Sequence, residues 1–84
     1  MSIILKTIKE IQKLQSITDD NRASNGVNAS VSQLKDLIKS LERIERESNK
    51  KHNLSGMGRY VSDYASQDSR LLNLIEKVIR NHGS

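Results

Sequence analysis

The chain has 84 residues, no cysteine and no proline, and fourteen lysine or arginine residues against ten aspartate or glutamate residues give a net charge of +4. This length limits the chain to a single domain, residues 1–84, with a small core, and the missing thiols exclude disulfides and cysteine-bound metals. The absence of phenylalanine and tryptophan, beside many Ile, Leu, Lys and Glu residues, favours an all-α fold. No stretch has the length of a membrane span or the pattern of a signal peptide. This predicts a cytoplasmic protein, or one secreted by a route without a signal.

The first predicted helix covers residues 2–18. Apolar side chains recur on one face at helical spacing, namely Ile4, Ile8, Ile11 and Leu14. A second face carries three lysines, Lys6, Lys9 and Lys13. Such a helix packs in a bundle or lies on an anionic membrane surface with its lysines at the headgroups. The absence of tryptophan and phenylalanine favours the bundle.

A loop and a second helix follow. Residues 19–29 are dense in Asp, Asn, Ser and Gly, which predicts a connection that is either partly mobile or ordered by a partner. The helix expected over 30–49 begins with Ser30 and Gln33 at the spacing of a capping box. Its predicted buried face consists of Val31, Leu34, Leu37, Ile38, Leu41 and Ile44.

Basic residues gather on the outer face of this second helix and around the connection that follows it. Three of them recur every four residues and therefore share one helical face, and the other three lie within residues 50–59. This pattern is typical of a surface that contacts nucleic-acid phosphates or other anions. It is also typical of a solvated surface in which glutamates dilute the positive charge. The candidate anion contacts are Lys35, Lys39, Arg43, Lys50, Lys51 and Arg59.

The third predicted helix, residues 57–82, carries the longest apolar stripe. Alternating steps of four and three return to one helical face, and six of the eight positions are apolar or aromatic. A stripe of this width favours coiled-coil-like packing in a bundle. The eight positions are Met57, Val61, Tyr64, Asp68, Leu71, Ile75, Val78 and His82.

Asp68 interrupts this stripe at a step that faces the core. Burial of an unpaired carboxylate is costly. Either the helix rotates locally and leaves Asp68 at the boundary of the core, or Asp68 forms a polar layer that fixes register or oligomeric state. A catalytic role would need a second titratable group nearby, and the sequence offers no obvious one.

These patterns together predict a small three-helix bundle, or a helical hairpin with an extra N-terminal helix. A core follows from the buried faces of the three predicted helices. The residues expected in it are Ile4, Ile8, Ile11, Leu14, Val31, Leu34, Ile38, Leu41, Val61, Tyr64, Leu71, Ile75 and Val78.

The sequence contains no metal-ligand spacing, nucleophile motif or cofactor fingerprint, which predicts a protein that is not an enzyme and binds no cofactor. A chain this small has more apolar stripe than it is expected to bury alone. The leading hypothesis is therefore a protein-interaction module that self-associates or binds and regulates a partner protein. The predicted interface is Val61, Tyr64, Asp68, Leu71, Leu72, Ile75 and Val78. The alternative hypothesis is a small basic nucleic-acid-binding regulator.

Overall fold

The computed structural model describes residues 2–83, and its regular structure in that range is helical. The all-α prediction is confirmed, with five helices in the described range where three were expected. The helices are α1 (Ile3–Gln15), α2 (Asp19–Ser24), α3 (Val31–Arg46), α4 (Ser55–Ser62) and α5 (Arg70–His82). None of these helices is both long and apolar enough to cross a membrane.

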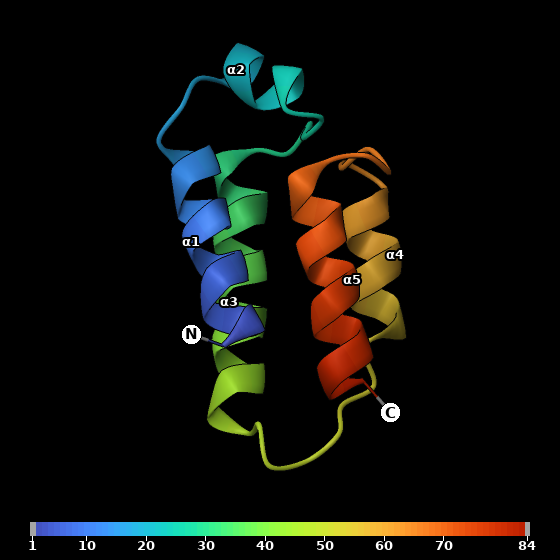
Figure 1. Ribbon diagram of the computed structural model, residues 1–84. Helices are drawn as coiled ribbons and strands as arrows, with labels where there is room; N and C mark the ends of the chain where they lie inside the picture. Colours follow the sequence, from blue (N-terminus) through green and yellow to red (C-terminus); the bar gives the residue numbers. More distant parts are fainter. Residues whose placement is uncertain (1, 84) are drawn as a thin grey trace.

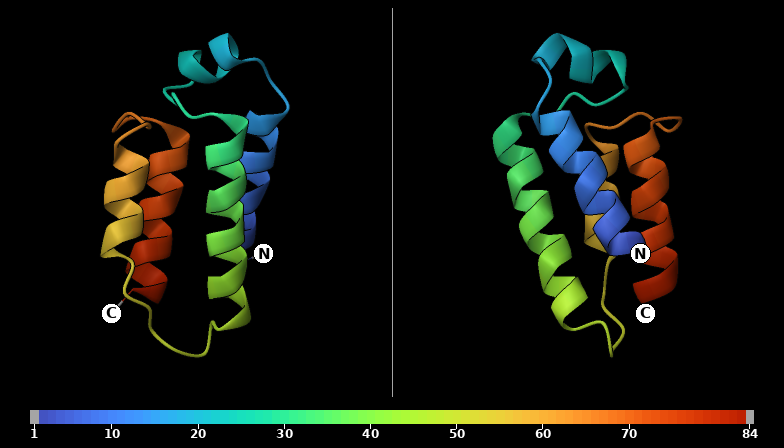
Figure 2. Two further views of the ribbon diagram at one scale, coloured as in Figure 1. Left: turned by 180° about the vertical axis from the view of Figure 1, so that it is seen from behind. Right: turned by 60° about the vertical axis from the view of Figure 1, so that its left-hand side comes forward.

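The four longer helices run up and down along one axis, and α2 lies across one end of them (Figure 1). Helix α1 packs against α3 and α5, and α5 packs against α4. The two views of Figure 2 show the same two pairs, α1 with α3 and α4 with α5, joined through α1 and α5. The resulting molecule is elongated, with extents of 37 × 20 × 20 Å.

The prediction of one continuous helix over 57–82 is wrong, because the chain turns back between α4 and α5. Ser69 ends the turn: its hydroxyl accepts a hydrogen bond from the amide of Leu72 at 3.2 Å and donates one to the Ser66 carbonyl at 2.6 Å. Serine side chains that bond to nearby backbone groups favour turns and N-caps over helix interiors. The apolar spacing continues through the turn because the helices on both sides of it face the same core.

Asp68 lies in this turn and not on a core-facing step of a helix. Its side chain is exposed, and Oδ1 accepts a hydrogen bond from the Ser66 hydroxyl at 2.8 Å. The predicted polar layer is therefore absent at Asp68, and the carboxylate contributes to the local structure of the turn.

The segment expected to be a loop, 19–29, contains α2 and a buried arginine. The hydroxyl of Thr18 caps α2 by accepting a hydrogen bond from the amide of Asn21 at 3.2 Å. Arg22 is only 1% exposed, and its guanidinium donates to the carbonyl oxygens of Leu14 and Ala29, both at 3.1 Å. Further partners of the same group are the carbonyl of Ile17 and the carboxylate of Asp19. These bonds compensate the cost of burying the charge and order the segment without a partner.

Backbone hydrogen bonds join this segment to the α4–α5 turn. The amide of Asn28 donates to the carbonyl of Tyr64 at 2.7 Å, and the amide of Ser66 donates to the carbonyl of Gly26 at 2.8 Å. Gly26 has a positive φ of 79°, and a Cβ there would lie 2.3 Å from Ser66 Oγ. The close approach of the two segments therefore needs glycine at this position. At the opposite end of the bundle, the amide of His52 donates to the carbonyl of His82 at 2.8 Å.

Most of the predicted core is confirmed. Eleven of its thirteen residues are buried; Val31 is 47% exposed, and Ile38 is half-buried. Val31 is the first residue of α3 and lies at the end of the bundle, where few side chains cover it. The capping box of Ser30 and Gln33 is also confirmed, because both of its hydrogen bonds are present.

Candidate functional site

The predicted interface residues lie inside the chain's own fold. Asp68 is the exception, and it is exposed in the α4–α5 turn. The stripe on α4 and α5 is therefore covered by the other helices and presents no surface to a partner. The buried residues are Val61, Tyr64, Leu71, Leu72, Ile75 and Val78.

The exposed apolar side chains do not replace this interface. Three large ones are more than 40% exposed within the described residues: Leu5 on α1, Val31 on α3 and Tyr60 on α4. Single exposed apolar residues on different helices are ordinary for a small domain. The surface available for binding thus consists mainly of charged and neutral polar side chains.

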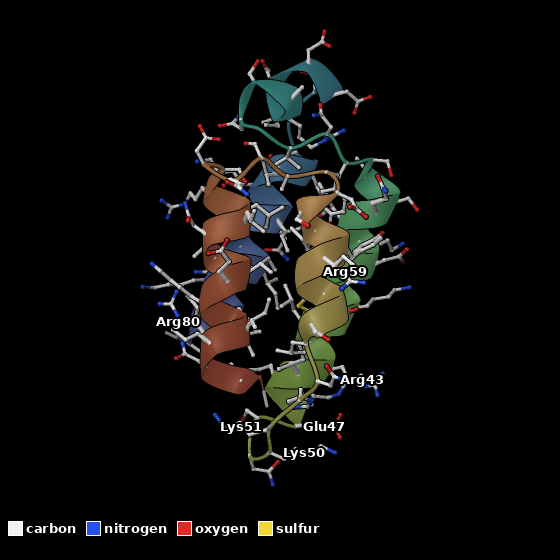
Figure 3. The ribbon with its side chains drawn as sticks, turned by 90° about the vertical axis from the view of Figure 1, so that its right-hand side faces the viewer. Arg43, Glu47, Lys50, Lys51, Arg59 and Arg80 are labelled. Carbon is white, nitrogen blue, oxygen red and sulfur yellow. The ribbon has the colours of Figure 1, made fainter. Side chains whose placement is uncertain are left out.

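The six predicted anion contacts are all exposed, and three of them lie toward the end of the bundle opposite α2. Figure 3 shows Arg43 at the C-terminal part of α3, Lys50 and Lys51 in the connection, and Arg59 about half-way along the bundle on α4. Arg43, Lys50 and Lys51 are called the basic end below. Lys35 and Lys39 lie further along α3 toward α2, so the structure does not bring all six together.

Glu47 neutralises part of the basic end. Its carboxylate lies 3.0 Å from Lys50 Nζ and 3.7 Å from Arg43 Nε. The hydrogen bond and the charge of Lys50 hold the pKa of Glu47 below its ordinary value. Lys51 is also engaged, because its ammonium donates to the carbonyl of Asn81 at 3.2 Å. An incoming anion would compete with these contacts.

A second basic surface lies in an open groove of about 770 Å³ between α1 and α5. These two helices lie side by side on the face of the molecule that Figure 1 turns to the viewer. The groove is lined by Ile3, Lys6, Lys9, Glu10 and Lys13 from α1 and by Asp68, Arg70, Asn73, Leu74 and Lys77 from α5 and the turn before it. We call it the basic groove.

Both carboxylates of the basic groove already have partners. Glu10 Oε1 lies 3.2 Å from Arg70 Nε, and Asp68 accepts the hydrogen bond from Ser66. Within residues 2–83, none of the four groove lysines has a carboxylate within 4.0 Å. These lysines, Lys6, Lys9, Lys13 and Lys77, together with Arg70 give the basic groove five cations against two carboxylates, so its net charge is positive.

No three His, Asp or Glu side chains in the described part of the chain lie close enough together to hold a metal ion. His52 Nε2 lies 2.9 Å from the carbonyl of Glu47 and takes a structural role in the connection. The Tyr64 hydroxyl is buried without a hydrogen-bond partner, and this burial raises its pKa. It therefore does not meet solvent.

The sequence identified the lysine face of α1 but not its neighbour across the groove. Lys77 and Arg70 belong to a helix more than fifty residues away in the chain, and only the packing of α1 against α5 brings them beside Lys6 and Glu10. Comparisons of the chain with protein-family models, curated proteins and solved structures give no match. Function is therefore argued from the site itself.

Proposed function

We propose that this chain is a small non-enzymatic interaction module that binds and regulates a partner protein through the basic groove. The observation that carries the proposal is the set of four groove lysines without a carboxylate partner among the described residues. The burial of the apolar stripe on α4 and α5 supports it further, because an apolar self-association surface has no large exposed patch to use. Charged surfaces of this kind provide specificity and fast association.

The experiment is a quantitative pull-down from the native host after nuclease treatment, with three forms of the tagged chain. The groove variant is Lys6→Glu with Lys77→Glu. The control variant is Lys35→Glu with Lys39→Glu, which makes the same change of charge on exposed positions of α3. We expect a protein that the wild type and the control retain and that the groove variant loses. Identical sets of captured proteins for all three forms would contradict the proposal, and circular dichroism checks that each variant is folded.

Light scattering over a range of concentrations tests the alternative of self-association. We expect the mass of a single chain throughout, since the apolar stripes of the four long helices are used inside the bundle. A mass that rises with concentration would favour self-association over binding of a different protein.

Nucleic-acid binding is the second candidate, and the gathering of Arg43, Lys50 and Lys51 at one end supports it (Figure 3). It ranks lower because Glu47 lies close to two of these three side chains. It predicts a gel shift of duplex DNA that weakens steeply with salt, because phosphate contacts release counterions. The variant Lys50→Glu with Lys51→Glu is then expected to abolish the shift, whereas the groove variant retains it.

A further inference from the structure

We infer that the basic groove binds an acidic helical segment of the partner protein, with two carboxylates about two turns apart and an apolar side chain between them. This inference rests on the proposed function and deepens it, because it names the chemistry of the partner. It follows from the shape of the groove, the positions of its cations and the apolar residues that line it.

The shape of the groove suits a helix. Its walls, α1 and α5, are antiparallel neighbours of 13 residues each, or about 20 Å in length. The furrow between two packed helices is the site that a third helix occupies in bundles and in helix-in-groove complexes. A segment of three to four turns would span it.

The cations are spaced for carboxylates on one helical face. Lys6 and Lys13 are seven residues apart on α1, which places them about 10 Å apart along the helix axis. Glu10 lies between them and is paired with Arg70. Lys77 is two turns further along α5 than Arg70, toward the end where Ile3 and Lys6 lie. Acidic residues at i and i+7 of a bound helix would therefore meet cations at both ends of the groove.

The groove also contains apolar surface, which distinguishes a protein helix from nucleic acid. Ile3 is half-buried and lines the groove together with Leu74. An apolar side chain on a bound helix gains from contact with these residues, whereas a phosphodiester backbone does not.

The probe is a synthetic helical peptide with glutamates at i and i+7 and leucines at i+3 and i+4. The control peptide has the same composition in an order that scatters the carboxylates around the helix. Binding is measured by fluorescence anisotropy in about 0.1 M salt, where charges remain effective over about 10 Å. We expect the patterned peptide to bind at least about tenfold more tightly than the control peptide, since each correctly placed charge pair adds to the affinity.

The chain variants locate the site. The groove variant, Lys6→Glu with Lys77→Glu, is expected to weaken binding of the patterned peptide by at least about tenfold. The control variant, Lys35→Glu with Lys39→Glu, is expected to weaken it by less than about threefold. Equal binding of the two peptides, or equal loss with both variants, would overturn the inference. Tight binding of a duplex DNA oligonucleotide that the groove variant abolishes would overturn it in favour of nucleic acid.

The two proposals fail in different ways. If a partner is captured through the groove but the chain does not prefer the patterned peptide, the inference of an acidic helix fails and the proposed interaction module stands. If the chain prefers the patterned peptide but the pull-down yields no partner that depends on the groove, the proposed function has no support from the native host.

Discussion

The guanidinium of Arg22 donates to the carbonyl oxygen of Leu14 across 3.1 Å and thereby joins α2 to the last turn of α1. The same side chain reaches the carbonyl of Ala29 before the start of α3. One buried cation thus fixes the path between two core helices.

Replacement of this arginine is expected to cost more than any exposed substitution. Arg22→Ala removes the donors for the carbonyls of Leu14, Ile17 and Ala29 and leaves a cavity, for an expected loss of about 3 kcal/mol in the free energy of unfolding. Arg22→Lys keeps the charge but not the planar fork, and we expect it to recover less than half of that loss. Urea denaturation measures both. A loss below about 0.5 kcal/mol for Arg22→Ala would show that these bonds contribute little.

Gly26 and Gly56 form a matched pair for the second prediction. Gly26→Ala is expected to destabilise by about 2 kcal/mol, because φ is 79° and the new Cβ would meet Ser66 Oγ. Gly56→Ala places a Cβ that meets nothing within 4 Å inside α4, so we expect it to stabilise by about 0.5–1 kcal/mol. The melting temperatures of the two variants should therefore shift in opposite directions. Equal shifts would contradict the prediction.

Asp68→Leu is expected to leave both stability and size almost unchanged. The side chain is exposed in the α4–α5 turn and loses only the bond with Ser66, so the expected change is within about 0.5 kcal/mol. Urea denaturation and light scattering test this together. A clear rise in the free energy of unfolding together with a larger assembly would restore the idea that Asp68 limits a helical interface.

The pKa of Glu47 gives a prediction in solution. Lys50 lowers this pKa below its ordinary value of 4.5, so the pair stabilises the fold above that pH, and the contribution is lost as pH falls through the lowered pKa. Lys50→Gln should raise the pKa of Glu47 in an NMR titration of the carboxyl carbon. Arg43→Gln should raise it less, because the hydrogen bond and charge of Lys50 are the larger causes. A larger rise with Arg43→Gln would reverse that order.

The parts of the fold that depend on local signals follow from the sequence. The capping box of Ser30 and Gln33 and the 3.6-residue spacing in α1 and α3 are properties of neighbouring residues, and the structure confirms them. The α4–α5 turn does not follow from spacing, because a hairpin whose arms face one core continues the same apolar period that a straight helix has. Here the serines at 66 and 69 are the signal that distinguishes the two.

Long-range features could not be derived in the same way. A charged residue such as Arg22 is expected at the surface, and only the convergence of three carbonyls from separate segments makes its burial favourable. The basic groove likewise depends on which helices become neighbours. Lys6 and Lys77 belong to one site only because α1 packs against α5, and no periodicity within either helix indicates this.

The antiparallel contact of α1 and α5 also determines how the molecule responds to force. Helix α1 begins and helix α5 ends at the same end of the bundle (Figure 1). Tension between these two points would therefore separate the helices one turn at a time and would not load the whole contact at once. Separation would start beside Ile3 and Lys77 and reach the Glu10–Arg70 pair later, so the basic groove would widen well before the bonds of Arg22 at the far end are loaded.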